Sequence, residues 1–103
     1  MIDLIAEKLS DLKALCERHH VVSLSLFGSA ARGDFDPAKS DLDFLVEFAD
    51  LPPGELSRNF FDFSHALEEL FGRKVDLVFE HAVRNPYRKA AILHDKQPLY
   101  DAA

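Results

Sequence analysis

Hydrophobic and polar residues follow two different spacings in the first half of the chain. Over residues 1–19 the apolar positions recur at steps of three and four with charged residues between them, which predicts one amphipathic helix. From Val21 to Phe27 the apolar residues alternate with serines, which predicts a strand. A second alternating run over residues 40–48 predicts another strand, with Asp41 and Asp43 on the face opposite its larger apolar side chains.

The second half of the chain repeats this change of spacing. Residues 55–71 have the helical spacing and are followed by Gly72, a typical helix stop. Val75–Phe79 predicts a third strand, and residues 85–96 predict a helix that begins with an Asn-Pro cap. Residues 98–100 predict a final short edge strand. This order of elements predicts an α/β or α+β fold, in which helices cover a sheet.

Length and charge limit the class of protein. At 103 residues, with 48% hydrophobic residues, the chain is expected to form a single domain over residues 1–103. Its net charge of −6 argues against direct nucleic-acid binding. The sequence has no signal-peptide pattern and no apolar run of about 18 residues, so we expect no membrane association and a cytoplasmic location. The one cysteine, Cys16, lies on the apolar stripe and is expected in the core.

Two aspartates on the second strand depart from plain patterning. Asp41 and Asp43 are separated by one residue, so on a strand their side chains leave the same face about 6.5–7 Å apart. Two carboxylates at that spacing repel each other unless a cation lies between them, and Mg²⁺ prefers such oxygen ligands together with substrate phosphates. The plain alternative is a solvated strand face.

The turn after the first strand could bind an anion. Gly28 lets the backbone approach a phosphate closely, Ser29 adds a hydroxyl, and Arg32 lies one helical turn further on. The plain alternative is a tight turn from strand to helix. The segment is not a Walker A loop, because no Gly-Lys-Ser/Thr follows at the required spacing.

Asp76 is an acidic residue in the middle of the otherwise apolar third strand. A buried carboxylate is costly without a partner, so an inward-facing Asp76 would need one. If the second and third strands are neighbours, Asp76 can share a face with Asp41 and Asp43. Three carboxylates that face an anion-binding turn would form a two-metal phosphoryl-transfer site.

The segments 26–33 (LFGSAARG) and 40–46 (SDLDFLV) resemble the signature of the DNA polymerase beta nucleotidyltransferase superfamily. More narrowly, the chain resembles the minimal nucleotidyltransferases, the MntA-type antitoxin partners of HEPN toxins. The segments 72–78 (GRKVDLV) and 85–88 (NPYR) are also typical of that group, so the resemblance covers nearly the whole chain. Eleven residues separate Ser29 from Asp41, toward the longer side for this loop.

The resemblance implies a mixed sheet of three to four strands flanked by helices, and transfer of AMP from ATP to a hydroxyl. In MntA-like members the acceptor is a tyrosine of the HEPN RNase toxin, so the implied partner is a HEPN-type toxin and the chain its antitoxin. Carried over to this sequence, Gly28 and Ser29 bind the β and γ phosphates. Asp41 and Asp43 bind both Mg²⁺ ions, and Asp76 holds the catalytic ion or takes the acceptor proton. These aspartates are the implied catalytic residues.

Arg32 is either a phosphate contact or a structural tie of the loop. Two other functions stay open at this point. One is a nucleotidyltransferase that modifies a small molecule, although 103 residues leave little chain for an acceptor pocket. The other is a non-catalytic module that neutralises its partner by contact alone, for which Phe61 is a candidate surface residue because it breaks the inward helical spacing.

Overall fold

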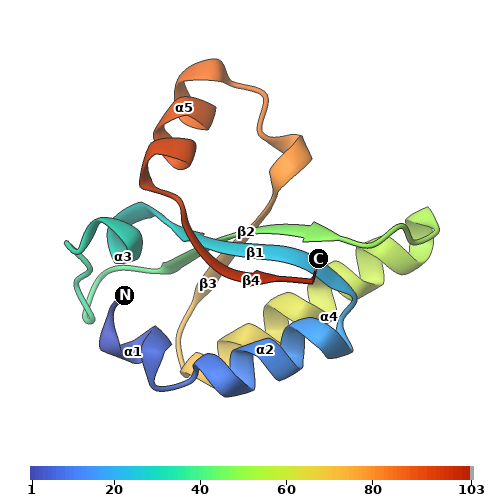
Figure 1. The fold of residues 1–103 in the computed structure, drawn as a ribbon, viewed down its shortest axis with the longest axis horizontal. Coiled ribbons are helices and arrows are strands. Elements are labelled where there is room, and N and C mark those ends of the chain that lie inside the picture. Colours follow the sequence, from blue (N-terminus) through green and yellow to red (C-terminus); the bar gives the residue numbers. More distant parts are fainter. Residues whose placement is uncertain (103) are drawn as a thin grey trace.

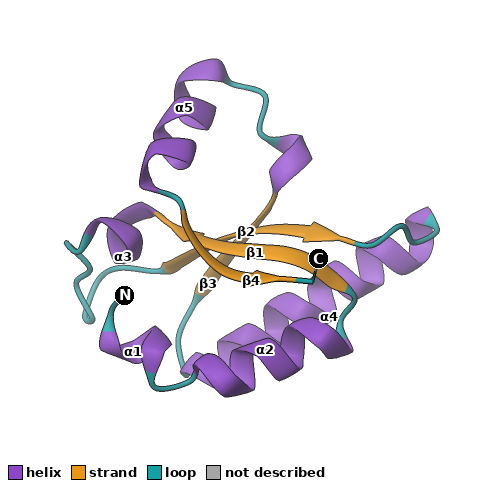
Figure 2. Cartoon of the chain, viewed as in Figure 1, coloured by secondary structure: helices purple, strands orange, loops and turns teal. Residues whose placement is uncertain are grey.

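The computed structural model describes residues 1–102, in which four strands form one mixed sheet with the order β3-β2-β1-β4 (Figure 1, Figure 2). The strands are β1 (Val21–Phe27), β2 (Leu42–Phe48), β3 (Val75–Phe79) and β4 (Gln97–Asp101). β2 and β3 are parallel, whereas β1 is antiparallel to both β2 and β4. The predicted mixed sheet is therefore confirmed, and β4 is an edge strand as expected.

Helices lie on both faces of this sheet (Figure 1). Their bounds are α1 (Asp3–Ala6), α2 (Leu9–Arg18), α3 (Gly28–Arg32), α4 (Pro53–Phe71) and α5 (Pro86–Asp95), with a 3₁₀ turn at Glu80–Ala82. In Figure 1, α2 and α4 run below the sheet and α5 rises above it. The crossover from β2 to β3 passes through α4, which is how parallel neighbours are usually joined. Within residues 1–102 no helix is both long and apolar enough to cross a membrane.

The main core lies between the sheet and the helices α2 and α4. Leu24 and Leu26 of β1 pack there with Phe44 of β2, and all three are fully buried. Cys16 belongs to the same core, as expected, and burial raises the pKa of its thiol to about 12. Each large apolar side chain buried in this way stabilises the fold by roughly 1.5–3 kcal/mol relative to an exposed one.

A smaller apolar cluster lies on the other face of the sheet, under α5. Phe27, Leu45 and Ile92 form it, and Val78 and Val83 pack against it. Because side chains alternate along β2, Asp43 shares this second face with Leu45, while Leu42 and Phe44 point into the main core. The alternation that the sequence predicts for this strand is thus confirmed.

The first helix and the start of the second strand differ from the prediction. The expected helix over residues 1–19 is broken between α1 and α2, where Lys8 leaves helical geometry with φ −114° and ψ 15°. Its N–H bonds to the Ile5 carbonyl three residues back, instead of continuing the i−4 ladder. The second strand begins at Leu42, two residues later than expected. The first hydrogen bond between this strand and the segment leading into β3 is donated by the Leu42 N–H to the Lys74 carbonyl, at 3.3 Å. Asp41 therefore precedes the strand.

The predicted C-terminal stop of α4 and the predicted N-cap of α5 are confirmed, whereas α4 begins at Pro53, two residues before the expected start. Gly72 follows α4 with φ 63°, the left-handed conformation that lets the chain turn towards β3. The Glu68 carboxylate then accepts a hydrogen bond from the Val75 N–H at 3.1 Å. At α5 the Asn85 side chain accepts hydrogen bonds from two N–H groups of the first turn. The prediction of one domain over residues 1–103 stays a prediction, and its last residue lies outside the described part.

Candidate active site

The ends of three strands meet at one edge of the sheet. Since β1 runs antiparallel to β2, its last residue, Phe27, pairs with Asp43 near the start of β2. Since β2 and β3 are parallel and in register, Asp43 also pairs with Asp76. Gly28, the first residue of α3, follows directly after Phe27. The sheet therefore brings the predicted anion-binding turn and two of the predicted carboxylates together, although they are far apart in sequence.

Gly28 and Asp43 are in close contact. Gly28 has φ 71°, a left-handed conformation that residues with a Cβ rarely adopt. A Cβ at this position would collide with Oδ2 of Asp43 and lie 3.1 Å from its Cγ. Glycine is thus required both by the backbone angle and by the neighbouring carboxylate. A phosphate held by this turn would lie against Asp43.

The carboxyl of Asp43 is in an unfavourable electrostatic environment. Partial burial is the largest cause that raises its pKa, the negative charges of Asp76 and Asp41 act in the same direction, and together these effects bring the pKa to about 6. The positive charges of Arg32 and Arg88 act on Asp43 in the opposite sense. A cation between the carboxylates would relieve this repulsion.

The other two aspartates are more open to solvent. Asp41 lies just before β2, with its Oδ2 3.9 Å from Nζ of Lys74. Asp76 is exposed on β3, which is an edge strand, so its carboxylate needs no buried partner. Across residues 1–102, no three Asp, Glu, His or Cys side chains converge closely enough to hold an ion by themselves. The all-oxygen set of carboxylates fits Mg²⁺ with substrate phosphates and water completing its ligands.

Arg32 is already paired. Its Nη1 donates a hydrogen bond to Oδ2 of Asp95 on α5 at 3.0 Å, and its Nε lies 3.5 Å from Oδ2 of Asp34. These partners raise the pKa of the guanidinium, and the Arg32 hydrogen bond lowers the pKa of the Asp95 carboxyl. Of the two roles left open for Arg32, this geometry favours the structural one, in which it ties α3 to α5.

Arg73 has a structural role that the sequence did not suggest. Its Nη1 donates a hydrogen bond to the Pro37 carbonyl at 3.1 Å, and its guanidinium lies 5.0 Å from the centre of the Phe35 ring. Both contacts are to the loop between α3 and β2, which connects the turn at Gly28 to Asp41 and Asp43. No local pattern marks such a residue, because its partners lie more than 30 positions away.

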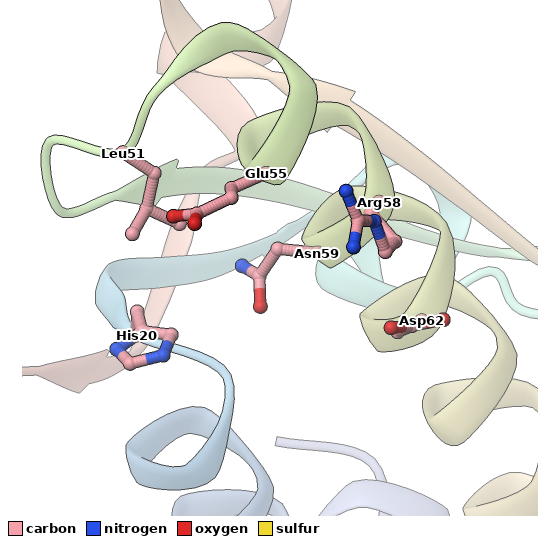
Figure 3. Close-up of a pocket in the computed structure, with 6 residues that line it drawn as sticks. All are labelled: His20, Leu51, Glu55, Arg58, Asn59 and Asp62. Atoms are coloured by element: carbon pink, nitrogen blue, oxygen red, sulfur yellow. The ribbon is translucent and has the colours of Figure 1, made fainter.

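A separate hollow lies at the other end of the sheet, beside the turn between α2 and β1 (Figure 3). Figure 3 shows its lining side chains, which come from that turn, from the β2–α4 loop and from α4: His20, Leu51, Glu55, Arg58, Asn59 and Asp62. None of them is a predicted site residue. The Asn59 amide donates a hydrogen bond to the His19 carbonyl at 2.7 Å, which ties α4 to this turn.

Comparison with known proteins decides the family. Residues 11–99 match the family model described as "Nucleotidyltransferase domain". This chain belongs to that family. The match includes the turn at Gly28 and all three aspartates of the edge, and it confirms the resemblance seen in the sequence.

Two similar proteins extend this family assignment. A Methanocaldococcus jannaschii protein named "Putative protein adenylyltransferase MJ0128" is 43% identical over 83 residues, which are 81% of each chain. "Protein adenylyltransferase MntA" of Thermococcus cleftensis is 34% identical over 80 residues, 78% of this chain and 77% of its own. The nucleotidyltransferase is therefore related to MntA proteins.

Solved structures share its fold. One described as "Structure of putative minimal nucleotidyltransferase" is 34% identical, covers 95% of this chain and 97% of its own, and superposes with a TM-score of 0.70. A second holds a "tri-AMPylated Shewanella oneidensis HEPN toxin in complex with MNT antitoxin". It is 17% identical, covers 94% of this chain and 72% of its own, and has a TM-score of 0.64. That second likeness is evidence for the fold alone.

Proposed function

We propose that this nucleotidyltransferase is a Mg²⁺-dependent protein adenylyltransferase that transfers AMP from ATP to a hydroxyl of a partner protein. The observation that carries the proposal is the contact between Gly28 and Asp43, because it lets one site hold a phosphate and carboxylate-bound metal side by side. The names of the relatives from M. jannaschii and T. cleftensis support protein adenylylation in particular. We further propose that residues 1–103 form one such catalytic domain.

The proposed reaction exchanges one bond at phosphorus for another. The acceptor hydroxyl oxygen forms a bond to the α-phosphorus of ATP, the bond from that phosphorus to the bridging oxygen of pyrophosphate breaks, and the hydroxyl proton passes to a carboxylate. Asp76 is the candidate for this proton because it is exposed at the edge of the sheet, where an incoming side chain can reach it. Gly28 and Ser29 hold the β and γ phosphates and so direct the leaving group away from the acceptor.

The metal would be held by Asp41, Asp43 and Asp76. When bound, Mg²⁺ neutralises charge on the phosphates and on the reacting oxygens. Asp43 contributes most from the protein side, because it lies between Asp76 and Gly28. Asp43 must be deprotonated for this role, and its raised pKa of about 6 lies below neutral pH.

We propose a HEPN-type toxin as the partner and a tyrosine of that toxin as the acceptor, which makes this chain the antitoxin. Support comes from the MntA relative and from the AMPylated HEPN toxin bound to the structurally similar MNT antitoxin. The exposure of Asp76 is consistent with an acceptor that a protein surface brings to the site. A partner surface is also available on α4, where Phe61 is 69% exposed, as the sequence led us to expect.

Intact mass spectrometry tests the proposal. A HEPN-domain toxin from the same genome is incubated with the protein and Mg-ATP, and the variant in which Asp41 and Asp43 are both Asn runs beside it. A third sample carries Asp11→Asn, an exposed aspartate of α2 outside the site. We expect the toxin to gain one or more AMP units with the wild type and with Asp11→Asn but not with the double variant. Peptide mapping then locates the modified tyrosine.

Other outcomes favour the alternatives. A stable complex whose toxin mass stays unchanged while RNase activity is lost would show a contact-only antitoxin. Consumption of ATP that depends on an added small hydroxyl compound, with no change in toxin mass, would show a small-molecule nucleotidyltransferase.

A further inference from the structure

Helix α5 carries an arginine on the side that faces the carboxylate edge. Ile92 is 5% exposed and packs with Phe27 and Leu45, which fixes the rotation of α5 about its own axis. Arg88 lies four residues before Ile92, so the two side chains leave the same side of the helix. On β2, Asp43 lies two residues before Leu45 and leaves the same face of the sheet. Ile92 and Leu45 are in contact, and Arg88 and Asp43 are their neighbours on the same side of α5 and of β2. The two charged side chains therefore lie on the same side of the sheet.

The neighbouring cation on the helix points elsewhere. Lys89 lines a hollow with Glu47, Glu80 and His81. Glu47 lies two residues after Leu45 on β2, whereas Asp43 lies two residues before it, so this hollow is further along the strand from Asp43. Arg88, in contrast, lies close enough to Asp43 for its positive charge to act on that carboxylate. Of the adjacent pair, it is therefore Arg88 that is directed to the candidate active site.

The guanidinium of Arg88 is not engaged by a protein carboxylate. Arg32, the other cation that acts on Asp43, is paired with Asp95 and Asp34. Within residues 1–102 no carboxylate lies within ion-pair distance of the Arg88 guanidinium. Its backbone, however, is fixed, because the Asn85 side chain accepts a hydrogen bond from the Arg88 N–H at 3.2 Å. Because the backbone of Arg88 is held in place and its guanidinium pairs with no carboxylate of the described residues, the guanidinium is suited to bind an anionic ligand.

We propose that Arg88 binds the phosphate chain of the nucleotide, the role for which Arg32 is the candidate in the sequence. The proposal rests on the proposed function, since it assumes a nucleoside triphosphate at this edge. A guanidinium binds phosphate oxygens through paired hydrogen bonds. It also offsets the repulsion between a polyanionic substrate and the three aspartates of the site, in a chain whose net charge is −6.

Calorimetric binding of an ATP analogue with a methylene bridge between the α and β phosphates, in the presence of Mg²⁺, tests this role. The analogue cannot donate AMP, so binding is measured apart from transfer. We expect Arg88→Ala to weaken binding roughly tenfold, the effect of losing a charge-assisted hydrogen bond, and Arg88→Lys to weaken it less. Lys89→Ala, which removes the same charge from the neighbouring position, is expected to bind like the wild type. The melting temperature of Arg88→Ala should equal that of the wild type, because the side chain makes no ion pair.

Inorganic tripolyphosphate with Mg²⁺ is the second probe. It has the phosphates of ATP without the nucleoside, so a phosphate contact predicts that Arg88→Ala weakens both probes to a similar degree. The proposal is overturned if Arg88→Ala binds both probes as tightly as the wild type, or if only the nucleotide analogue loses affinity. The first of these outcomes, with a wild type that binds the analogue and adenylylates the toxin, leaves the proposed function intact. A wild type that binds neither probe overturns both.

Discussion

Replacing Gly28 with alanine tests the contact on which the candidate site depends. The φ of 71° at Gly28 costs an L-residue about 1–2 kcal/mol, since a Cβ crowds the following carbonyl in this conformation. For a domain of this size that corresponds to a fall in melting temperature of about 5–15 °C. A native stability of about 5–15 kcal/mol leaves the variant folded. The added Cβ also collides with the Asp43 carboxylate, which must then move.

This displacement should affect catalysis far more than stability. A shift of about 1 Å in a group that positions reactants can cost about 100-fold in rate. We therefore expect Gly28→Ala to lower the rate of AMP transfer about 100-fold under conditions in which the protein is fully folded. The assay measures incorporation of labelled AMP into the HEPN partner, with the melting temperature determined in parallel.

Gly33→Ala is the matched control. Gly33 has φ 87°, so alanine there carries a similar backbone strain, but no atom lies within 4 Å of the added Cβ. We expect a comparable fall in melting temperature and a transfer rate within a few-fold of the wild type. If both variants lose stability equally and Gly28→Ala keeps the same transfer rate as Gly33→Ala, the close approach to Asp43 has no catalytic role and the reasoning is refuted.

Two further predictions concern the carboxylate cluster and the loop beside it. Because the fold raises the pKa of Asp43, the carboxyl of Asp43 binds its proton more tightly in the folded metal-free protein than in the unfolded chain. The free energy of unfolding should therefore fall as pH rises from about 4 to above 6. Asp43→Asn should abolish that dependence and raise the stability at pH 7.5 by on the order of 1 kcal/mol, a value reduced because the carboxyl is half-exposed; melting curves of the metal-free proteins at several pH values check this. Arg73→Ala should lower stability by about 1–2 kcal/mol through loss of its hydrogen bond to Pro37 and its contact with Phe35, and should speed limited proteolysis between α3 and β2. Equal cleavage rates in wild type and variant would contradict the role given to Arg73.

Local pattern was sufficient to predict that the four strands exist, although the second begins two residues later than expected, and to place Asp43 on the face of β2 opposite the main core. Val21–Phe27 and Val75–Phe79 have the predicted bounds, because alternation over a half-buried surface is a property of each segment by itself. The pairing of Asp43 with Asp76 was conditional on two strands being neighbours, and the parallel crossover through α4 fulfils that condition. Register then follows from the hydrophobic faces, since a slip by one residue would turn Leu42 and Phe44 to the wrong side.

Contacts between segments that are far apart in the chain could not be predicted from the sequence. Arg32 and Asp95 are 63 residues apart, so nothing near Arg32 indicates that its guanidinium is already used. The break at Lys8 has no proline or glycine to mark it. Asp76 looked like a carboxylate in need of a buried partner, and only its place on an edge strand explains why it is exposed. In each case the deciding information is which element packs against which.

The two faces of the sheet differ in how much apolar surface they bury, and the candidate site lies at the end of the less buried face. The face that packs on α2 and α4 holds the main core, whereas the face under α5 holds a small cluster around Leu45 and Ile92. The unfavourable features, the left-handed angle at Gly28 and the raised pKa of Asp43, lie at the edge of this second face. Strain of this kind persists only where the rest of the fold outweighs it, and it accumulates at functional sites. A domain whose core lay evenly on both faces would have to bury Asp43 more deeply, which would raise its pKa further and weaken metal binding at neutral pH. The partial cover by α5 therefore keeps the pKa of Asp43 at about 6, below neutral pH, and it leaves Arg88 exposed on the same side of the sheet.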